Sequence, residues 1–150
     1  MGRSQRHPRR DGSPQNAPAP VILLDTHVLV WTAVTPQRLT QRAARAIRRA
    51  EKGGLAIASI TLWELAFLFS RRRLRHRGTI EQSMREVLEA TRVAIKEITP
   101  EIAILAQQFA RPFPSDPQDR LIAATAIVEG LPLVTADDDI RASPLVRTIW

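Results

Sequence analysis

The stretch Val-Ile-Leu-Leu-Asp at residues 21–25 decides the fold class of this chain, because four consecutive apolar residues end directly at a carboxylate. An apolar run of this length is typical of a strand that is buried on both faces, as in a parallel sheet. Similar short apolar segments at residues 55–58, 93–98 and 131–135 predict three further strands, and residues 147–149 are a candidate fifth.

Segments with helical periodicity or helix-capping signals separate these strands. We expect helices at residues 27–34, 40–52, 61–74, 79–91, 100–110 and 117–129. Thr40 suits an N-cap, Pro117 suits the first position of a helix, and Gly130 suits the residue just past a helix end. Strands that alternate with helices predict an α/β fold with a central, mainly parallel sheet of four to five strands.

Composition limits the class of protein and of site. The chain has 150 residues, of which 44% are hydrophobic and 25% charged, so it is long enough for one soluble globular domain. It has no cysteine, so a metal ion could be held only by oxygen or nitrogen ligands. The net charge of +7 fits an anionic partner such as nucleic acid, although many soluble proteins are as basic.

The N-terminal segment differs in composition from the rest of the chain. Residues 1–20 are rich in Arg, Pro, Gly, Ser and Asn without apolar periodicity, which predicts a disordered basic tail, with an RNA- or partner-binding arm as the alternative. Residues 21–150 are expected to form one domain. No apolar run approaches the roughly 18 residues of a membrane span, and none has the position of a secretory signal, so we expect a cytoplasmic protein.

Four acidic residues follow predicted strands or begin the helices after them: Asp25, Glu64, Asp119 and Asp137. Each has a local explanation, because Asp25 suits an N-cap, Glu64 suits a Thr-x-x-Glu capping box and Asp119 suits the first turn of a helix. One of the aspartates at 137–139 is expected to cap a short helical turn. In a parallel sheet, however, all these positions converge on the edge where the strands end and where ligands bind.

Carboxylates gathered at one edge repel one another and raise one another's pKa unless a cation lies among them. Mg²⁺ and Mn²⁺ prefer oxygen ligands. Such ions activate water and stabilise the leaving oxygen in phosphodiester hydrolysis. The joint pattern therefore favours a metal-dependent hydrolase with one or two ions.

Four segments, in this order, resemble the PIN-domain family and, more closely, its VapC toxins. They are LLDTHVLVW at residues 23–31, SITLWELA at 59–66, PSDPQDRLIAATA at 114–126 and GLPLVTAD at 130–137. One such segment would be a weak signal, but four at this spacing are specific. The residues before Val21 depart from the family, whose members usually begin almost at the first strand.

The resemblance implies a PIN-like three-layer α/β/α fold and an acidic pocket for Mg²⁺ or Mn²⁺. The positions that match the family's catalytic and metal-binding acids are Asp25, Glu64, Asp119 and Asp137. The positions that match auxiliary groups are Asp116 and Asp139 as further acids, and Thr26 and Thr135 as hydroxyls beside the pocket. The resemblance also implies an endoribonuclease toxin of a type II toxin–antitoxin pair, which inhibits translation until a VapB-type antitoxin neutralises it, and a homodimer.

A dense basic cluster follows the third predicted helix and consists of Arg71, Arg72, Arg73, Arg75 and Arg77. It is either a solvated face or a set of phosphate contacts that position an RNA backbone without reading its sequence. We interpret Trp31 and Trp63 as core or dimer contacts rather than base-stacking platforms, and His27 as a helix-start and packing residue rather than a catalytic base.

Three other functions stay open. A PIN nuclease of RNA maturation would carry the same acids. A catalytically silent RNA- or protein-binding module would keep the fold but would not need the intact acidic set. A haloacid-dehalogenase-like phosphatase carries two aspartates one residue apart after the first strand, whereas this chain has Asp25-Thr26-His27 and lacks the second.

Overall fold

The computed structural model of the chain describes residues 20–150, so the tail expected at residues 1–20 lies, except for Pro20, outside the described residues. The described part contains a five-stranded sheet in the order β3-β2-β1-β4-β5, with all neighbouring strands parallel. The strands are β1 (Ile22–Leu24), β2 (Leu55–Ala58), β3 (Ala94–Lys96), β4 (Leu133–Val134) and β5 (Thr148–Ile149).

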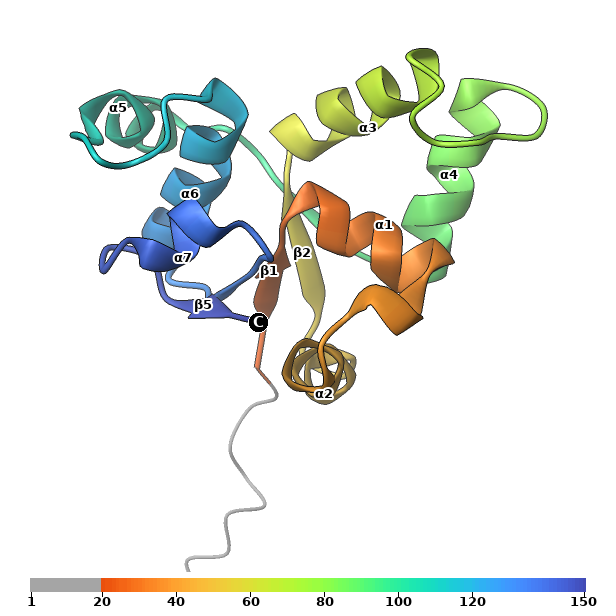
Figure 1. Cartoon of the computed structure of the whole chain (residues 1–150), viewed down its shortest axis with the longest axis horizontal. Coiled ribbons are helices and arrows are strands. Elements are labelled where there is room, and N and C mark those ends of the chain that lie inside the picture. Colours follow the sequence, from red (N-terminus) through yellow and green to blue (C-terminus); the bar gives the residue numbers. More distant parts are fainter. Residues whose placement is uncertain (1–19) are drawn as a thin grey trace, which may run out of the picture.

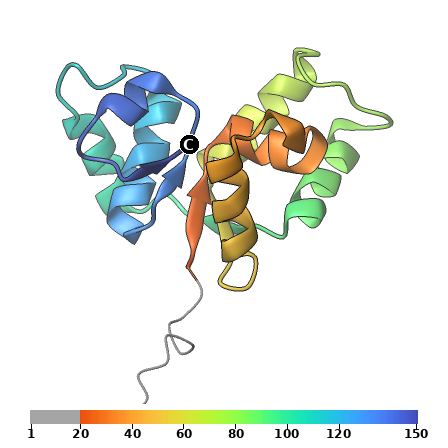
Figure 2. The same ribbon diagram turned by 60° about the horizontal axis from the view of Figure 1, so that its bottom comes forward.

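The helices form two layers with the sheet between them (Figure 1). They are α1 (Thr26–Val34), the 3₁₀ turn η2 (Pro36–Arg38), α2 (Gln41–Ala50), α3 (Ile60–Ser70), α4 (Ile80–Thr91), α5 (Pro100–Gln108), α6 (Pro117–Glu129) and α7 (Asp138–Ala142). Helices α1 to α4 lie on one side and α5 to α7 on the other, and a turn of the molecule by 60° keeps these groups apart (Figure 2). The expected three-layer α/β/α fold with a parallel sheet is confirmed.

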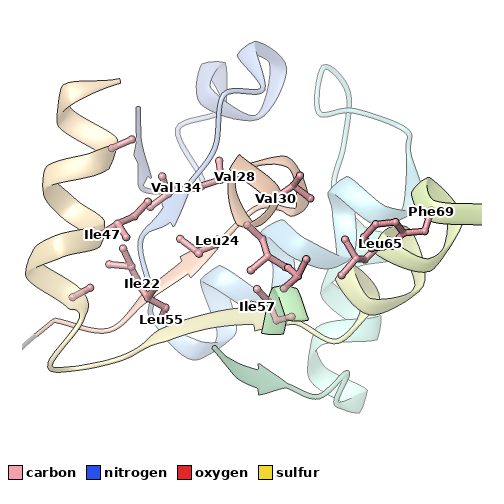
Figure 3. Close-up of a cluster of buried hydrophobic side chains, with 14 residues drawn as sticks. Ile22, Leu24, Val28, Val30, Ile47, Leu55, Ile57, Leu65, Phe69 and Val134 are labelled. Carbon is pink, nitrogen blue, oxygen red and sulfur yellow. The ribbon is translucent and has the colours of Figure 1, made fainter. Parts of the chain in front are cut away.

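The three central strands β1, β2 and β4 have no polar face, because each buries alternate residues against a different helical layer. The edge strand β3 is largely exposed. In β1, Ile22 and Leu24 join the cluster formed with α1 to α4, whereas Leu23 joins the cluster formed with α5, α6 and α7. In β2, Leu55 and Ile57 face the first layer (Figure 3), and Ala56 and Ala58 face the second. This double burial explains the continuous apolar runs of the sequence.

Helix ends follow the chemistry of their first and last residues. The Thr40 hydroxyl accepts a 3.1 Å hydrogen bond from the N–H of Ala43 and so caps α2. Helix α6 begins with Pro117 after the N-cap Asp116 and ends at Gly130, whose φ of 66° suits a residue without a side chain. These local signals are the reason that most helices could be placed from sequence to within a few residues.

The predicted helix over residues 61–74 is wrong at its C-terminal end. Helix α3 ends at Ser70, and Arg72 takes left-handed backbone angles with a φ of 55°. The N–H groups of Arg73 and Leu74 then turn back to the carbonyl of Leu68. Together with the hydrogen bond from the N–H of Arg72 to the carbonyl of Phe69, this is the Schellman pattern, which satisfies the last carbonyls of α3 and ends the helix.

Strand β1 occupies the centre of the sheet and is the point where the chain reverses its direction of winding. Strand β2 follows on one side of β1 and β4 is added on the other. In open α/β sheets, the crevice beyond the carboxyl ends of strands at such a reversal is the usual place for a ligand. Asp25 directly follows β1 there. No helix within residues 20–150 is long and apolar enough to span a membrane.

Candidate functional site

A cleft of about 640 Å³ lies beyond the carboxyl ends of the central strands. Its acidic lining residues are Asp25, Glu64, Asp116, Asp119 and Asp137. They come from the end of β1, from α3, from the start of α6 and from the end of β4, so segments that are distant in sequence converge as the parallel sheet predicted. All four principal acids and the auxiliary Asp116 therefore share one cleft.

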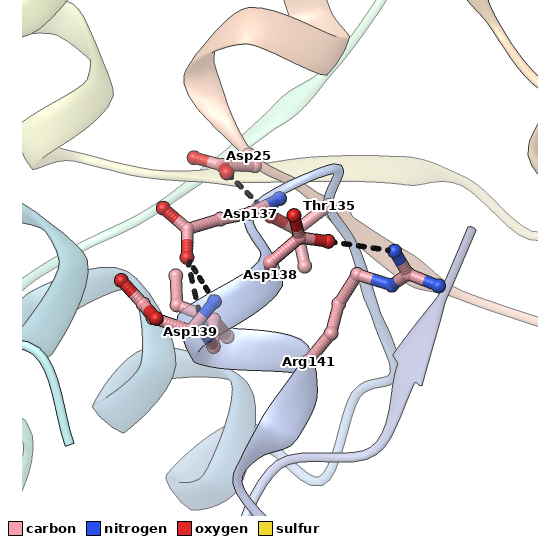
Figure 4. Close-up of polar contacts among 7 residues, drawn as sticks. Asp25, Thr135, Asp137, Asp138, Asp139 and Arg141 are labelled. Atoms are coloured by element: carbon pink, nitrogen blue, oxygen red, sulfur yellow. Dashed lines mark hydrogen bonds and ion pairs between the residues drawn. The ribbon is translucent and has the colours of Figure 1, made fainter. Parts of the chain in front are cut away.

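Asp25 is the most buried of these acids, with 7% of its surface exposed. Its Oδ1 accepts a 2.8 Å hydrogen bond from the N–H of Thr26, and its Oδ2 accepts a 2.7 Å hydrogen bond from the Thr135 hydroxyl (Figure 4). Burial raises the pKa of Asp25, the two hydrogen bonds lower it, and Asp137 adds a smaller increase. A backbone N–H and a side-chain hydroxyl thus fix this buried carboxylate in the cleft.

Asp137 and Asp116 each combine a capping role with a place in the cleft. Oδ1 of Asp137 accepts hydrogen bonds of 2.9 Å from the N–H groups of Asp139 and Ile140 at the start of α7. Oδ1 of Asp116 accepts a 2.8 Å hydrogen bond from the N–H of Gln118 at the start of α6. Capping therefore explains their backbone position but does not remove them from the site.

Asp139, which matched an auxiliary acid, is exposed and does not line the cleft. The carboxylate of its neighbour Asp138 forms an ion pair with Arg141, with 3.2 Å between Oδ1 and Nη1 (Figure 4). Of the three consecutive aspartates, only Asp137 lies in the cleft.

The capping-box interpretation of Glu64 is wrong. Helix α3 begins at Ile60, two residues earlier than that motif requires, and its N-cap Ser59 makes no side-chain cap. Thr61 is inside the helix, and its buried hydroxyl forms a 3.0 Å hydrogen bond with the hydroxyl of Thr26. Glu64 therefore has no capping role and lines the cleft instead.

The acids affect one another's ionisation. Burial raises the pKa of Glu64, the Thr26 hydroxyl lowers it, and Asp25 and Asp116 raise it further. At Asp119, burial and then the charges of the four other acids raise the pKa to about 7. This mutual repulsion shows that the five carboxylates lie within electrostatic reach of one another.

The chemistry of this donor set fits a hard divalent cation, because all the acidic ligands are oxygens and their repulsion is relieved by positive charge. Among residues 20–150, no three acidic or histidine side chains are placed so that they could hold one ion without movement. Coordination therefore requires small side-chain rotations, which the exposed and half-buried acids of the cleft can make more easily than Asp25.

The rim of the cleft contains residues that the sequence did not assign to the site. It is lined by Trp63 and Phe67 from α3, by His27 and Trp31 from α1, and by Arg73. Trp63 is 55% exposed and is not a core residue, which corrects that part of its interpretation. His27 is also exposed rather than packed. In the sequence, the available indication of this exposure was that Trp63 directly precedes Glu64. Because Glu64 faces the cleft, an exposed position for its neighbour in the helix is reasonable.

The predicted basic cluster is a surface feature. Its five members, Arg71, Arg72, Arg73, Arg75 and Arg77, are all exposed, and none of the ion pairs found in the described residues involves them. Arg73 lines the acidic cleft and also a neighbouring groove between α1 and α4. An unpaired positive surface thus borders the negative cleft.

Comparisons with known proteins agree with this geometry. The family model described as PIN domain matches residues 22–144. Over 131 residues the chain is 39% identical to Ribonuclease VapC22 of Mycobacterium tuberculosis, covering 86% of this chain and 98% of the relative.

Two solved structures share the fold. One is VapBC2 from Rickettsia felis bound to a DNA fragment from their promoter, with 20% identity and a TM-score of 0.65 over 85% of this chain and 96% of that one. The other is DNA-bound VapBC from Salmonella typhimurium, with 22% identity and a TM-score of 0.64 over 86% and 96%.

Proposed function

The chain belongs to the PIN-domain family, and from this premise we propose that it is a divalent-metal-dependent endoribonuclease that acts as the toxin of a VapBC-type toxin–antitoxin pair. Its action would hydrolyse RNA phosphodiester bonds and so inhibit translation. The observation that carries the proposal is the convergence of five carboxylates on one cleft, where burial and the charges of the four other acids raise the pKa of Asp119 to about 7. A cluster of acids with pKa values raised in this way is typical of a functional site rather than of a site that stabilises the fold.

We assign the metal ligands to Asp25, Glu64, Asp119 and Asp137, with Asp116 as an auxiliary acid. Asp139 is a weaker candidate because it lies outside the cleft lining. When bound, Mg²⁺ or Mn²⁺ would supply activated water and stabilise the charge that develops on the phosphate and on the leaving oxygen.

The chain's own side chains would perform the other tasks. Thr135 and the N–H of Thr26 hold both oxygens of Asp25 and fix its orientation. The arginines at 71–77 would attract the RNA backbone to a cleft whose own charge is negative and repels phosphate. The rim would therefore bind the RNA backbone without a metal ion, whereas cleavage would need the cation to offset the repulsion between the phosphate and the acids of the cleft.

We further propose a VapB-type antitoxin as the partner that neutralises the activity, and a homodimer as the assembled toxin. Support comes from the structural neighbours, which are VapBC complexes, and from the apolar side chains of α3 beside the cleft. Leu65 and Phe69 of this helix are buried in the core, whereas Phe67 and Leu68 line the cleft and are accessible to a partner.

Cleavage of total bacterial RNA tests the proposal. The purified protein is incubated with RNA in Mg²⁺, in Mn²⁺ and in EDTA, beside Asp25→Asn and the control Glu89→Gln, which changes an exposed acid of α4 outside the cleft. We expect discrete products that require metal, disappear in Asp25→Asn and persist in Glu89→Gln.

Products that persist in EDTA or in Asp25→Asn would contradict the metal-dependent mechanism. If no product forms and calorimetry finds no metal binding to the folded protein, the catalytic proposal fails and a binding module is favoured. Metal binding without cleavage would direct the search to individual tRNA, rRNA and mRNA substrates.

A further inference from the structure

Trp63 and Phe67 form a stacked aromatic pair on the open side of α3. Their ring centroids are 5.7 Å apart with an angle of 15° between the planes. Trp63 lies one helical turn before Phe67 and is 55% exposed, although a large apolar side chain of this kind is usually buried. The pair therefore extends from the half-buried Phe67 to an indole ring that faces solvent.

Two arginines surround the same aromatic pair. The guanidinium carbon of Arg71 lies 5.5 Å from the centroid of the Phe67 ring, and that of Arg73 lies 5.8 Å from it. These are cation–π distances, which orient each guanidinium group and leave its hydrogen-bond donors available. Neither arginine takes part in an ion pair within the described residues.

This aromatic and cationic surface is part of the acidic cleft rather than a separate patch. Trp63, Phe67 and Arg73 line the same cleft as the carboxylates. Trp63 also precedes Glu64 directly, so the indole and a proposed metal ligand are adjacent on one helix.

We propose that Trp63 and Phe67, with Arg71 and Arg73, form a subsite that stacks one unpaired nucleobase of the substrate next to the phosphate to be cleaved. The inference rests on the proposed ribonuclease function and adds to it a residue set that positions the strand. An aromatic face binds any base by stacking, and neighbouring arginines bind its phosphates, which is how proteins hold single-stranded nucleic acid.

The stacking subsite selects between single-stranded and duplex RNA. A base in a duplex is already stacked on its neighbours, so only a base that is splayed out can use the Trp63 face. The subsite therefore favours loops, bulges and single strands over duplex RNA. A protein partner would gain from the apolar ring as well, but it would not require the unpaired Arg71 and Arg73 beside an acidic cleft.

Binding in EDTA tests the subsite without requiring catalysis. A fluorescent single-stranded RNA of mixed sequence, the same RNA in a duplex, and a ribose–phosphate strand without bases are titrated with wild-type protein, Trp63→Ala, Trp63→Phe and Arg73→Gln. We expect Trp63→Ala to weaken binding of the base-containing single strand by roughly tenfold or more. Trp63→Phe should retain most of the affinity.

The strand without bases separates stacking from other effects. Its affinity should be unchanged in Trp63→Ala and lowered in Arg73→Gln, because the arginine contacts phosphate in both strands. Leu145→Ala is the matched control, since it removes an apolar side chain that is 60% exposed and lies outside the cleft. It should leave all the affinities unchanged.

Equal affinities of wild type and Trp63→Ala for base-containing RNA would overturn the proposal, as would an equal loss for both strands. Unchanged RNA affinity with an altered molecular mass in light scattering would assign Trp63 to an interface between copies and would also overturn it. Because the titration contains no metal, these outcomes are independent of the Asp25→Asn cleavage test. The ribonuclease function can therefore stand when the subsite fails.

Discussion

The hydroxyl of Thr135 donates a 2.7 Å hydrogen bond to Oδ2 of Asp25, which joins the ends of β1 and β4 across 110 positions of sequence. The same hydroxyl accepts a 3.1 Å hydrogen bond from the N–H of Asp137. One small side chain therefore links two proposed metal ligands, and its contact with Asp25 lowers the pKa of that buried carboxyl against the effect of burial.

Substitution Thr135→Val keeps the shape of the side chain and removes both hydrogen bonds. We expect a loss of about 1–3 kcal/mol in the free energy of unfolding, because buried Asp25 loses a donor. We also expect Mn²⁺ affinity to fall about 10- to 100-fold, as for other residues that orient metal ligands. Urea unfolding and calorimetric titration measure the two effects.

Thr135→Ser is the matched control because it retains the hydroxyl. Near-wild-type metal affinity in Thr135→Ser, beside a loss in Thr135→Val, would assign the effect to the hydrogen bond. Equal affinity in all three proteins would show that Thr135 does not orient Asp25.

The raised pKa values predict a pH-dependent response to metal. The pKa of Asp119 is about 7 in the fold, well above the value of an exposed aspartate, and those of Asp25 and Glu64 are raised in the same direction. Between about pH 4 and pH 7 the folded state binds more protons than the unfolded state, so the stability of the metal-free protein falls as pH rises through this range.

Divalent ions bind the ionised carboxylates and should reverse this trend. We expect Mn²⁺ to raise the Tm more at about pH 8 than at about pH 5, and EDTA to remove the increase. Thermal unfolding with and without Mn²⁺ at both pH values measures this. An equal increase at both pH values would contradict a role for these acids.

Asp119→Asn should make the metal-free protein more stable while it removes function. The substitution abolishes a charge that burial and four neighbouring acids oppose, so we expect a higher Tm in EDTA at about pH 8. The increase should be smaller at about pH 5, where Asp119 is protonated in the fold and ionised in the unfolded chain. RNA cleavage should be lost. Glu89→Gln, in an exposed position outside the cleft, should change neither property. A lower Tm for Asp119→Asn at the higher pH would show that its charge is stabilising.

Much of this site could be predicted from sequence because strand ends in a parallel sheet share an edge. The apolar run of β1 ended at Asp25, and that alone placed the carboxylate at the functional edge. The local signals could not separate a cap from a cleft residue, since Asp137 and Asp116 each cap a helix and also line the cleft. At Glu64 they were misleading, because a shift of two residues in the helix start takes Thr61 out of the capping position.

The rest depended on tertiary structure. No periodicity shows that Trp63 is exposed, because α3 is apolar on nearly every side and its buried face is chosen by contact with α4, α6 and the sheet. The end of α3 and the approach of Arg71 and Arg73 to Phe67 likewise depend on how the chain turns at Arg72.

Arg120 is predicted to hold the segment that leads to the acids of α6. Its guanidinium donates hydrogen bonds of 2.8, 3.3 and 2.9 Å to the carbonyls of Pro114, Ala106 and Phe109 respectively. Arg120→Ala leaves these carbonyls without that donor, and we expect a loss of about 2–3 kcal/mol in urea unfolding, together with weaker Mn²⁺ binding.

Arg85→Ala is the control for loss of an arginine, because Arg85 forms only an exposed pair with Glu81 among the described contacts. Its effect should be below about 1 kcal/mol. If Arg120→Ala is destabilised but keeps wild-type metal affinity, Arg120 serves the fold and does not position the acids.

The hydrogen bond between the hydroxyls of Thr26 and Thr61 predicts a non-additive pair of substitutions. Both residues are fully buried, and the two oxygens are 3.0 Å apart. Either Thr26→Val or Thr61→Val leaves the other hydroxyl without this partner and should reduce the free energy of unfolding by about 1–3 kcal/mol. The double variant replaces both hydroxyls with methyl groups of similar size, so its loss should be smaller than the sum of the single losses.

Urea unfolding of the wild type, the two single variants and the double variant measures the coupling. Additive losses would show that the hydrogen bond between the two hydroxyls contributes nothing to stability. Because the Thr26 hydroxyl also lowers the pKa of Glu64, both proteins that carry Thr26→Val should bind Mn²⁺ more weakly than Thr61→Val, even where stability is restored.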